Sequence, residues 1–145
     1  MNDSLHVVCP NCGAVNRMPP ERLKNKPNCG RCHSTLFNGK PVALDQRSFK
    51  THLERNDIPL VVDFWAPWCG PCHAMAPAFE AAAKQLEPHV RLAKIDTEQE
   101  ATLAAQFNIR SIPTLAVFRG GREIARQTGA MSAKQLLDWI RNTTA

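Results

Sequence analysis

The sequence predicts an α/β protein, a mixed central sheet flanked by helices, preceded by a small cysteine-rich segment. Strand-type and helix-type patterns alternate over residues 41–145, whereas four of the six cysteines lie in residues 1–40, where aliphatic side chains are few. A turn-rich seam, Asn38-Gly39-Lys40-Pro41, separates the two regions. We therefore divide the chain into an N-terminal segment, 1–40, and a main domain, 41–145.

Branched and aromatic runs predict the strands of the main domain, and apolar residues at helical spacing predict its helices. In chain order we expect a helix over Ser48–Arg55, a strand over 59–65, a helix from near Pro71 through Leu86, a strand over 90–95, a helix through Phe107, strands over 114–119 and 122–128 around Gly120-Gly121, and a final helix through Ile140. Thr97 with Glu100, and Ser132 with Gln135, match the capping-box pattern that opens a helix. This order predicts a mixed sheet with helices on both faces.

Composition limits the protein classes that fit. The chain has 145 residues, 43% of them hydrophobic, which suits one ordinary domain with an appendage. No stretch approaches the roughly 20 apolar residues of a membrane span, so we expect no membrane segment. The N-terminus lacks the basic start and apolar run of a signal peptide, which predicts a cytoplasmic protein. In that compartment cysteines are metal ligands or redox groups more often than structural disulfides.

The N-terminal cysteines follow the pattern C-x2-C-x16-C-x2-C. This is the spacing of a structural zinc site, in which each two-residue gap lets both sulfurs reach one tetrahedral ion. Four thiolates would close the coordination shell, and the bound ion would replace the missing core, so we expect the segment to fold only when metallated. The competing interpretations are disulfides or free thiols, with His6 and His33 as possible substitute ligands. The predicted zinc ligands are Cys9, Cys12, Cys29 and Cys32.

The charge of the N-terminal segment argues against nucleic-acid binding. Residues 1–40 hold six Lys and Arg against two acids. A zinc tetrathiolate would leave a net charge of only about +2, which is a small electrostatic footprint for phosphate contacts. Phe37 is the one aromatic residue there. We expect a structural, regulatory or partner-selecting role instead.

The third cysteine pair lies in a different setting. Cys69 ends the turn between the strand over 59–65 and the helix that begins near Pro71. Free amide groups and the helix dipole would favour a thiolate at Cys69, making it a nucleophile near neutral pH. Cys72, expected to be the more buried, could then release a mixed disulfide. The spacing alone would also fit half a metal site or two inert core thiols.

Trp68-Cys69-Gly70-Pro71-Cys72 resembles the active site of the thioredoxins. Further anchors follow in the family's order and spacing: residues 62–66, Lys94, Ile112-Pro113-Thr114 and Gly129. The likeness covers roughly residues 41–145, and the cysteine-rich start is similar to that of the zinc-containing bacterial members. The resemblance implies a thioredoxin fold with a small N-terminal zinc-ribbon-like domain.

The resemblance also implies roles for two charged residues. Asp63 stands in an apolar strand, so burial should raise the pKa of its carboxyl and make it a proton acceptor for Cys72. Lys94 would be a buried partner that opposes this shift. The alternatives are a solvent-facing Asp63 at the strand end and an ordinary surface lysine at 94.

Ile112-Pro113 resembles the cis-proline of the family, which would offer the backbone of residue 112 to an extended target chain. An ordinary trans proline is the alternative. Trp65 is expected in the core, and His73, where the family often has Lys or Arg, is expected to be a solvated helix residue. The expected substrate-docking residues are Trp68, Gly70, Pro71, Ile112, Pro113 and Gly129.

The function expected from these features is reduction of disulfides in protein substrates. An NADPH-dependent thioredoxin reductase would re-reduce the protein, which is expected to be a monomer. The chain has no dinucleotide-binding glycine motif, so we expect no nicotinamide or flavin on it. Two alternatives stay open: a disulfide isomerase or oxidase on the same fold, and a zinc-dependent binding or holdase module that carries a redox domain.

Overall fold

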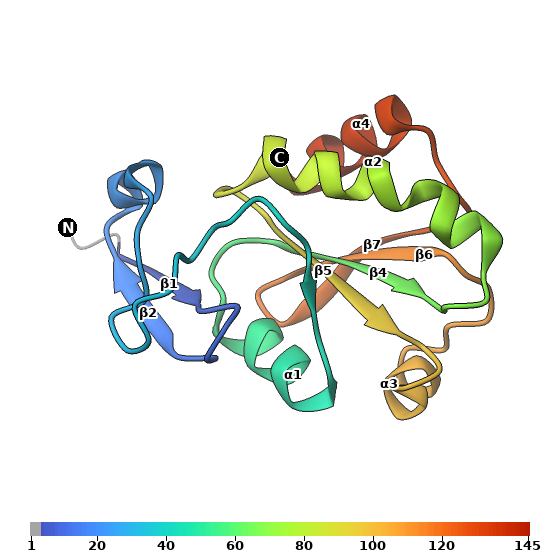
Figure 1. Ribbon diagram of the computed structural model, residues 1–145, viewed down its shortest axis with the longest axis horizontal. Coiled ribbons are helices and arrows are strands. Elements are labelled where there is room, and N and C mark those ends of the chain that lie inside the picture. The colour runs from blue at the N-terminus through green and yellow to red at the C-terminus, as the bar shows by residue number, and fades with distance from the viewer. Residues whose placement is uncertain (1–3) are drawn as a thin grey trace.

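Five strands form one mixed sheet through the larger part of the molecule (Figure 1). The computed structural model describes residues 4–145. The strand order is β3-β5-β4-β6-β7, with β3, β5 and β4 parallel and the β4-β6 and β6-β7 pairs antiparallel. The strands are β3 (Val42–Ala43), β4 (Leu60–Trp65), β5 (Arg91–Asp96), β6 (Thr114–Arg119) and β7 (Arg122–Thr128).

The four long strands confirm the sequence prediction. β6 and β7 have the expected bounds, and the turn between them is made by Gly120 and Gly121, both at positive φ, 61° and 79°. Glycine adopts this conformation without the penalty of a Cβ, which is why the pair fixes the hairpin. The short strand β3 was not expected, and it pairs with β5 at the edge of the sheet.

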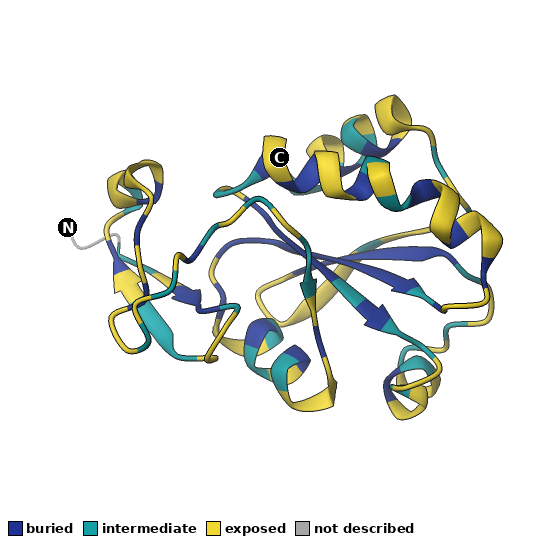
Figure 2. Cartoon of the chain, in the orientation of Figure 1, coloured by how far each residue is buried: buried dark blue, intermediate teal, exposed yellow. Residues whose placement is uncertain are grey.

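Helices cover both faces of the sheet, as predicted (Figure 1). Apolar residues of α2 and α4 pack on one face, and residues of α1 and α3 pack on the other. Figure 2 shows the central strands buried between these layers. No helix within residues 4–145 is long and apolar enough to cross a membrane. The helices are α1 (Gln46–Arg55), α2 (Gly70–Leu86), α3 (Ala101–Gln106) and α4 (Ala133–Thr144).

The helix starts confirm one capping prediction and correct the other. Ser132 caps α4 and forms the expected box with Gln135. The box predicted for Thr97 and Glu100 is wrong: α3 begins after Glu100, whose side chain makes no cap bond to α3 and instead accepts the N–H of Gln46, the first residue of α1, at 3.0 Å. The Thr97 hydroxyl instead donates to the carbonyl of Trp65 at 3.0 Å, so it ties the ends of β4 and β5 together.

The N-terminal segment forms a small unit with its own apolar cluster. Strands β1 (Leu5–Val8) and β2 (Val15–Met18) pair antiparallel, and a 3-10 helix, η1 (Pro20–Asn25), follows. Its buried cluster combines two cysteines with aliphatic and methionine side chains: Val7, Cys9, Met18, Leu23, Cys29 and Leu36. We call this unit the ribbon. Residues 1–3 of the predicted segment 1–40 lie outside the described residues.

A buried arginine joins the ribbon to the main domain. The Arg91 side chain is fully buried and donates to the carbonyls of Val8, at 3.3 Å, and Leu36, at 2.8 Å, both in the ribbon. It also pairs with Glu87 at 3.1 Å. The ribbon therefore packs at the N-terminal end of β5, and Figure 1 shows it at the opposite end of the sheet from the point where β4 leads into α2.

Candidate active site and metal centre

Cys69 and Cys72 lie where β4 leads into α2, and they form a disulfide. Cys69 is the N-cap of α2, and its sulfur accepts the backbone N–H of Cys72 at 3.2 Å. Pro71 occupies the first turn of the helix, where its missing N–H costs nothing. A helix start that donates an amide to sulfur and presents its positive dipole end stabilises a thiolate at Cys69 in the reduced protein.

The two cysteines are equally buried, each 3% exposed, so the expectation that Cys72 is the more buried is wrong for the disulfide form. The reason is that Cys69 is covered by Ala66, Trp65 and Ile112, which pack around the pair. Its sulfur lies 3.9 Å from the carbonyl oxygen of Ile112. Burial therefore does not distinguish the two cysteines. Their electrostatic surroundings do, because only Cys69 is the N-cap of α2.

Asp63 is a buried carboxyl on β4. It is 1% exposed, and neither carboxylate oxygen has a hydrogen-bond partner within the described residues. Val61 packs against α2, and alternate residues of a strand point to the same face, so Asp63 also faces the α2 side of the sheet. Burial raises the pKa of Asp63 to about 7. The alternative of a solvent-facing carboxyl is wrong.

Lys94 lies directly across from Asp63 in the parallel pairing of β4 and β5. Its positive charge lowers the pKa of Asp63 and so opposes the larger effect of burial. The two side chains do not form an ion pair; instead the Lys94 ammonium lies over the ring of Trp65, 4.4 Å from its centroid. The expected buried partner is thus a half-buried cation that acts on Asp63 at a distance.

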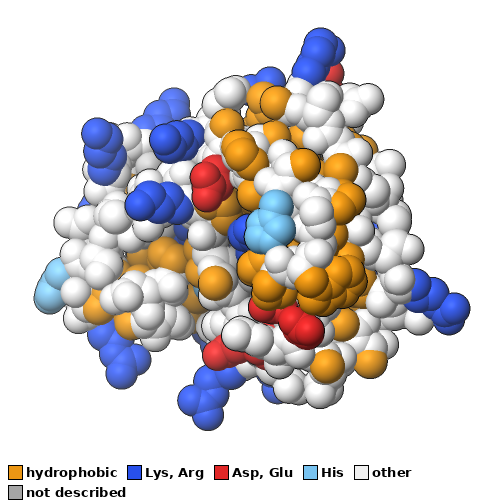
Figure 3. Space-filling view, turned by 45° about the vertical axis from the view of Figure 1, so that its right-hand side comes forward, with side chains coloured by type: hydrophobic (Ala, Val, Ile, Leu, Met, Phe, Trp, Pro, Cys, Tyr) orange, Lys and Arg blue, Asp and Glu red, His pale blue; other side chains and the backbone are white. Residues whose placement is uncertain are grey.

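An exposed face surrounds the disulfide. Trp68 is 68% exposed, and Gly70 and Pro71 are exposed beside it. The Ile112–Pro113 peptide bond is cis, as the resemblance implied, and the carbonyl of Pro113 accepts the N–H of Gly129 at 2.9 Å. Figure 3 shows hydrophobic side chains gathered on this side of the molecule.

Two aromatic residues beside the disulfide make contacts that the sequence did not indicate; His73 is an exposed residue of α2, as expected, whereas Trp65 lies outside the main core. His73 is exposed but not free: its Nε2 lies 2.6 Å from the carbonyl of Pro67, and a carbonyl can only accept, so Nε2 carries the proton. Its ring meets that of Trp65 edge-on, with centroids 6.0 Å apart. Trp65 is half-buried and packs against the cysteine pair rather than in the main core. The only sequence signal for the contacts of His73 was that position 73 holds a histidine where the family often has Lys or Arg.

The four N-terminal cysteines converge, as predicted. Their sulfur atoms all lie within 4.8 Å of one another. Backbone amides of each two-residue loop donate to sulfur, Asn11 to Cys9 and Arg31 to Cys29, both at 3.4 Å. Within the described residues the cluster contains no histidine, so neither His6 nor His33 is a substitute ligand. His6 instead contacts Asp57 at 3.1 Å.

The donor set fits a zinc ion. Hydrogen bonds lower the pKa of Cys32 to about 5 and that of Cys29 to about 7, whereas burial raises the pKa of Cys9 to about 11. Four sulfur donors at the corners of one small cluster match the closed tetrahedral shell of structural zinc and leave no position for a substrate.

Comparison with known proteins gives the same two parts. The family described as Thioredoxin matches residues 40–142, and the family described as Thioredoxin 2, N-terminal, matches residues 8–34. "Thioredoxin C-3" of Corynebacterium nephridii is 46% identical over 92% of this chain and 92% of its own length. "Thioredoxin" of Porphyra purpurea is 44% identical over 61% of this chain and 83% of its own length.

A solved structure extends the likeness to three dimensions. A mutant thioredoxin from Halobacterium salinarum NRC-1 superposes with a TM-score of 0.68 and 29% identity, covering 77% of this chain and 97% of its own. Sequence family, fold and the buried disulfide at the start of α2 agree. The chain therefore belongs to the thioredoxin family and is a protein-disulfide reductase with Cys69 and Cys72 as its active-site pair.

Proposed function

We propose that Cys69 is the attacking thiol and Cys72 the resolving thiol in the reduction of protein disulfides. The observation that carries this assignment is the position of Cys69 at the N-cap of α2, with its sulfur accepting the amide of Cys72. An N-cap sulfur receives both an amide donor and the helix dipole, so its thiolate is favoured over that of a sulfur inside the helix.

The exchange then runs in two balanced steps. The Cys69 thiolate attacks one sulfur of the target disulfide, and the other target sulfur leaves as a thiolate and takes up a proton. The Cys72 thiol loses its proton and attacks the Cys69 sulfur, which expels the first target sulfur. Two electrons have passed to the target, and the chain is left with the Cys69–Cys72 disulfide of the present structure.

We assign Asp63 as the group that accepts the Cys72 proton, with Lys94 adjusting its basicity. A carboxyl with a pKa of about 7 is half ionised at neutral pH, which suits a general base at the working pH. Its two oxygens have no partner among the described residues, so either can take a proton.

We assign the exposed face around the disulfide as the substrate-docking surface. An exposed indole beside a reactive sulfur supplies apolar contact area, and the backbone of Ile112, whose carbonyl lies 3.9 Å from the Cys69 sulfur, can pair with an extended target chain. This surface comprises Trp68, Gly70, Pro71, Ile112, Pro113 and Gly129.

We propose one structural Zn²⁺ held by Cys9, Cys12, Cys29 and Cys32, and no nicotinamide or flavin on this chain. The electrons would come from an NADPH-dependent thioredoxin reductase, which carries its own cofactors. Reduction of disulfides suits the cytoplasm, where we place the protein. We propose that it is a monomer and that it does not bind nucleic acid. We keep the domain division at residues 1–40 and 41–145.

Insulin reduction with Cys69→Ser and Cys72→Ser tests the assignment. Cys69→Ser should abolish dithiol-dependent turnover, because no thiolate remains to attack. Cys72→Ser should accumulate a mixed disulfide between Cys69 and the substrate, visible by mass spectrometry. Turnover that survives Cys69→Ser, or a substrate adduct on Cys72 in its place, would overturn the roles.

The midpoint potential of the dithiol separates a reductase from an oxidase or isomerase. A value well below that of glutathione supports the reductase. A value at or above it would favour the oxidising alternatives.

A further inference from the structure

Two adjoining cavities form a groove between the ribbon and the main domain. The larger, about 570 Å³, lies between α2, β5 and the segment that joins the ribbon to β3. The smaller, about 240 Å³, lies between the ribbon and the end of α2. Gly39 and Lys84 pack against each other and line both cavities, so the two cavities adjoin, and we call them together the junction groove.

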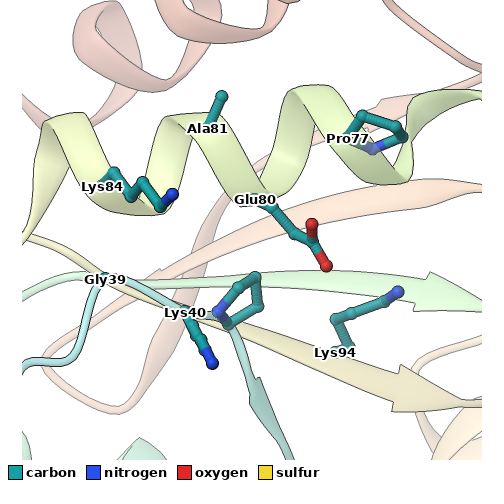
Figure 4. Close-up of a pocket in the computed structure, with 8 residues that line it drawn as sticks. Gly39, Lys40, Pro77, Glu80, Ala81, Lys84 and Lys94 are labelled. Carbon is teal, nitrogen blue, oxygen red and sulfur yellow. The ribbon is translucent and has the colours of Figure 1, made fainter.

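The junction groove is strongly basic. Of the two acidic residues that line the groove, Glu80 has no ion-pair partner in the described part of the chain, whereas Glu87 is paired with the buried Arg91 at 3.1 Å. The buried Asp63 carboxyl also interacts with Lys94. Among residues 4–145, no groove lysine has a side-chain hydrogen bond or ion pair. In Figure 4, Glu80 extends from α2 toward the side of the groove that carries Lys94. Five lysines line the groove: Lys24, Lys26, Lys40, Lys84 and Lys94.

The groove follows α2 away from the disulfide. Its α2 side is formed by Pro77, Glu80, Ala81 and Lys84, which recur on one face of the helix. At 1.5 Å per residue, this face is about 10 Å long and begins about 12 Å from Cys69. An extended chain advances about 3.3 Å per residue. Four residues would therefore span from the reactive sulfur to the groove, and three to five more would lie along its cations.

We propose that the junction groove binds an acidic, extended segment of the disulfide-bearing protein substrate. This inference rests on the proposed function, since it adds a charge preference to the docking of those substrates. The lysines line two adjoining cavities rather than one, which suits a chain of carboxylates better than one small anion. Both walls are needed, so the ribbon selects partners by helping to form the groove.

Nucleic acid fits the groove less well. Phe37 is the one aromatic ring that lines the groove, and the Arg91 guanidinium, 4.6 Å from the ring centroid, occupies one of its faces, which limits base stacking.

A matched pair of peptides tests the proposal. Each carries a disulfide, a neutral four-residue spacer and then five Glu or five Gln, and the full-length, zinc-loaded protein reduces it. Each exposed ion pair between a glutamate and a groove lysine should contribute only a small amount of binding energy. At low salt we therefore expect the KM for the Glu peptide to be only about five- to tenfold lower than the KM for the Gln peptide. Because four of the five groove lysines are exposed, 0.5 M salt should remove most of this preference.

Charge-matched variants locate the effect. The groove variant combines Lys26→Gln, Lys40→Gln and Lys84→Gln, and it should reduce the KM ratio of the two peptides to about one. The control variant changes three exposed cations outside the groove and should keep the wild-type ratio. The control substitutions are Lys50→Gln, Arg55→Gln and Arg122→Gln.

Each other outcome overturns the proposal or the function beneath it. Equal KM values for the two wild-type reactions, or loss of the preference in both variants, would remove the groove as a specific site. Equal competition from a single-stranded oligonucleotide and from poly-glutamate would make it a general polyanion site and overturn the acidic-peptide assignment. Failure to reduce even the Gln peptide would instead remove the proposed reductase chemistry.

Discussion

The buried carboxyl of Asp63 gives the most quantitative prediction. Its pKa rises from the ordinary 3.8 to about 7 in the folded protein. The folded state therefore holds a proton that the unfolded chain has lost, and stability falls as pH rises between these two values. Ionising the buried group costs about 4 kcal/mol once the pH is well above 7.

Asp63→Asn removes this cost while keeping the size of the side chain. Burial of the amide adds its own penalty, but that penalty does not depend on pH. The variant should therefore gain stability relative to wild type by about 2 to 3 kcal/mol between pH 5 and pH 8.5. Urea unfolding of both oxidised proteins at several pH values measures this difference, and effects of pH on the ribbon cancel between them.

Glu54→Gln is the matched control, because Glu54 is an exposed carboxyl. The difference in unfolding free energy between Glu54→Gln and wild type should not change over the same pH range. A flat profile for Asp63→Asn as well would show that Asp63 ionises normally. The assignment of this carboxyl as a base near neutral pH would then fail.

Three further predictions concern the ribbon and the docking face. Arg91→Ala should destabilise the protein by about 3 to 5 kcal/mol in urea unfolding, because it leaves Glu87 buried without its partner, while exposed Lys134→Ala should change stability by less than about 1 kcal/mol. Removing zinc with a chelator should abolish hydrogen-exchange protection in β1 and β2 but leave that of β4 and β6; loss of protection in both regions together would contradict a separate metal-dependent unit. Trp68→Ala should raise the KM for a protein disulfide, with little effect on stability or on reduction of a small aromatic disulfide, since this indole is 68% exposed; unchanged KM would remove it from the docking surface.

The sequence predicted those features that depend on local chemistry. The hairpin of β6 and β7 matched residue for residue because paired glycines leave few other conformations. The clustering of the four ribbon cysteines and the cap at Ser132 were equally predictable, since each depends on short-range spacing. The box expected at Thr97 failed because its hydroxyl found a partner on a neighbouring strand, which no local pattern records.

Contacts between distant residues set the remaining differences. The sequence gives no sign that Arg91, at the start of a strand, is special. In the structure it is completely buried, and it donates to the carbonyls of Val8 and Leu36, which are 83 and 55 positions away in the chain. The equal burial of Cys69 and Cys72 depends on Ile112, which another strand connection brings to the site. The junction groove likewise exists only once the ribbon has packed, so neither part alone predicts it.

The placement of the ribbon at the far end of the sheet keeps two kinds of sulfur apart within one chain. Thiol exchange requires direct contact of sulfur atoms, so the metal-binding thiols of a folded molecule cannot attack its own active-site disulfide. The distance between the two groups, and not a difference in thiol reactivity, thus prevents disulfide exchange among the six cysteines of one molecule. A disulfide between a ribbon cysteine and Cys69 or Cys72 must therefore join two separate molecules. Such a disulfide would show that two copies of the chain had come into contact.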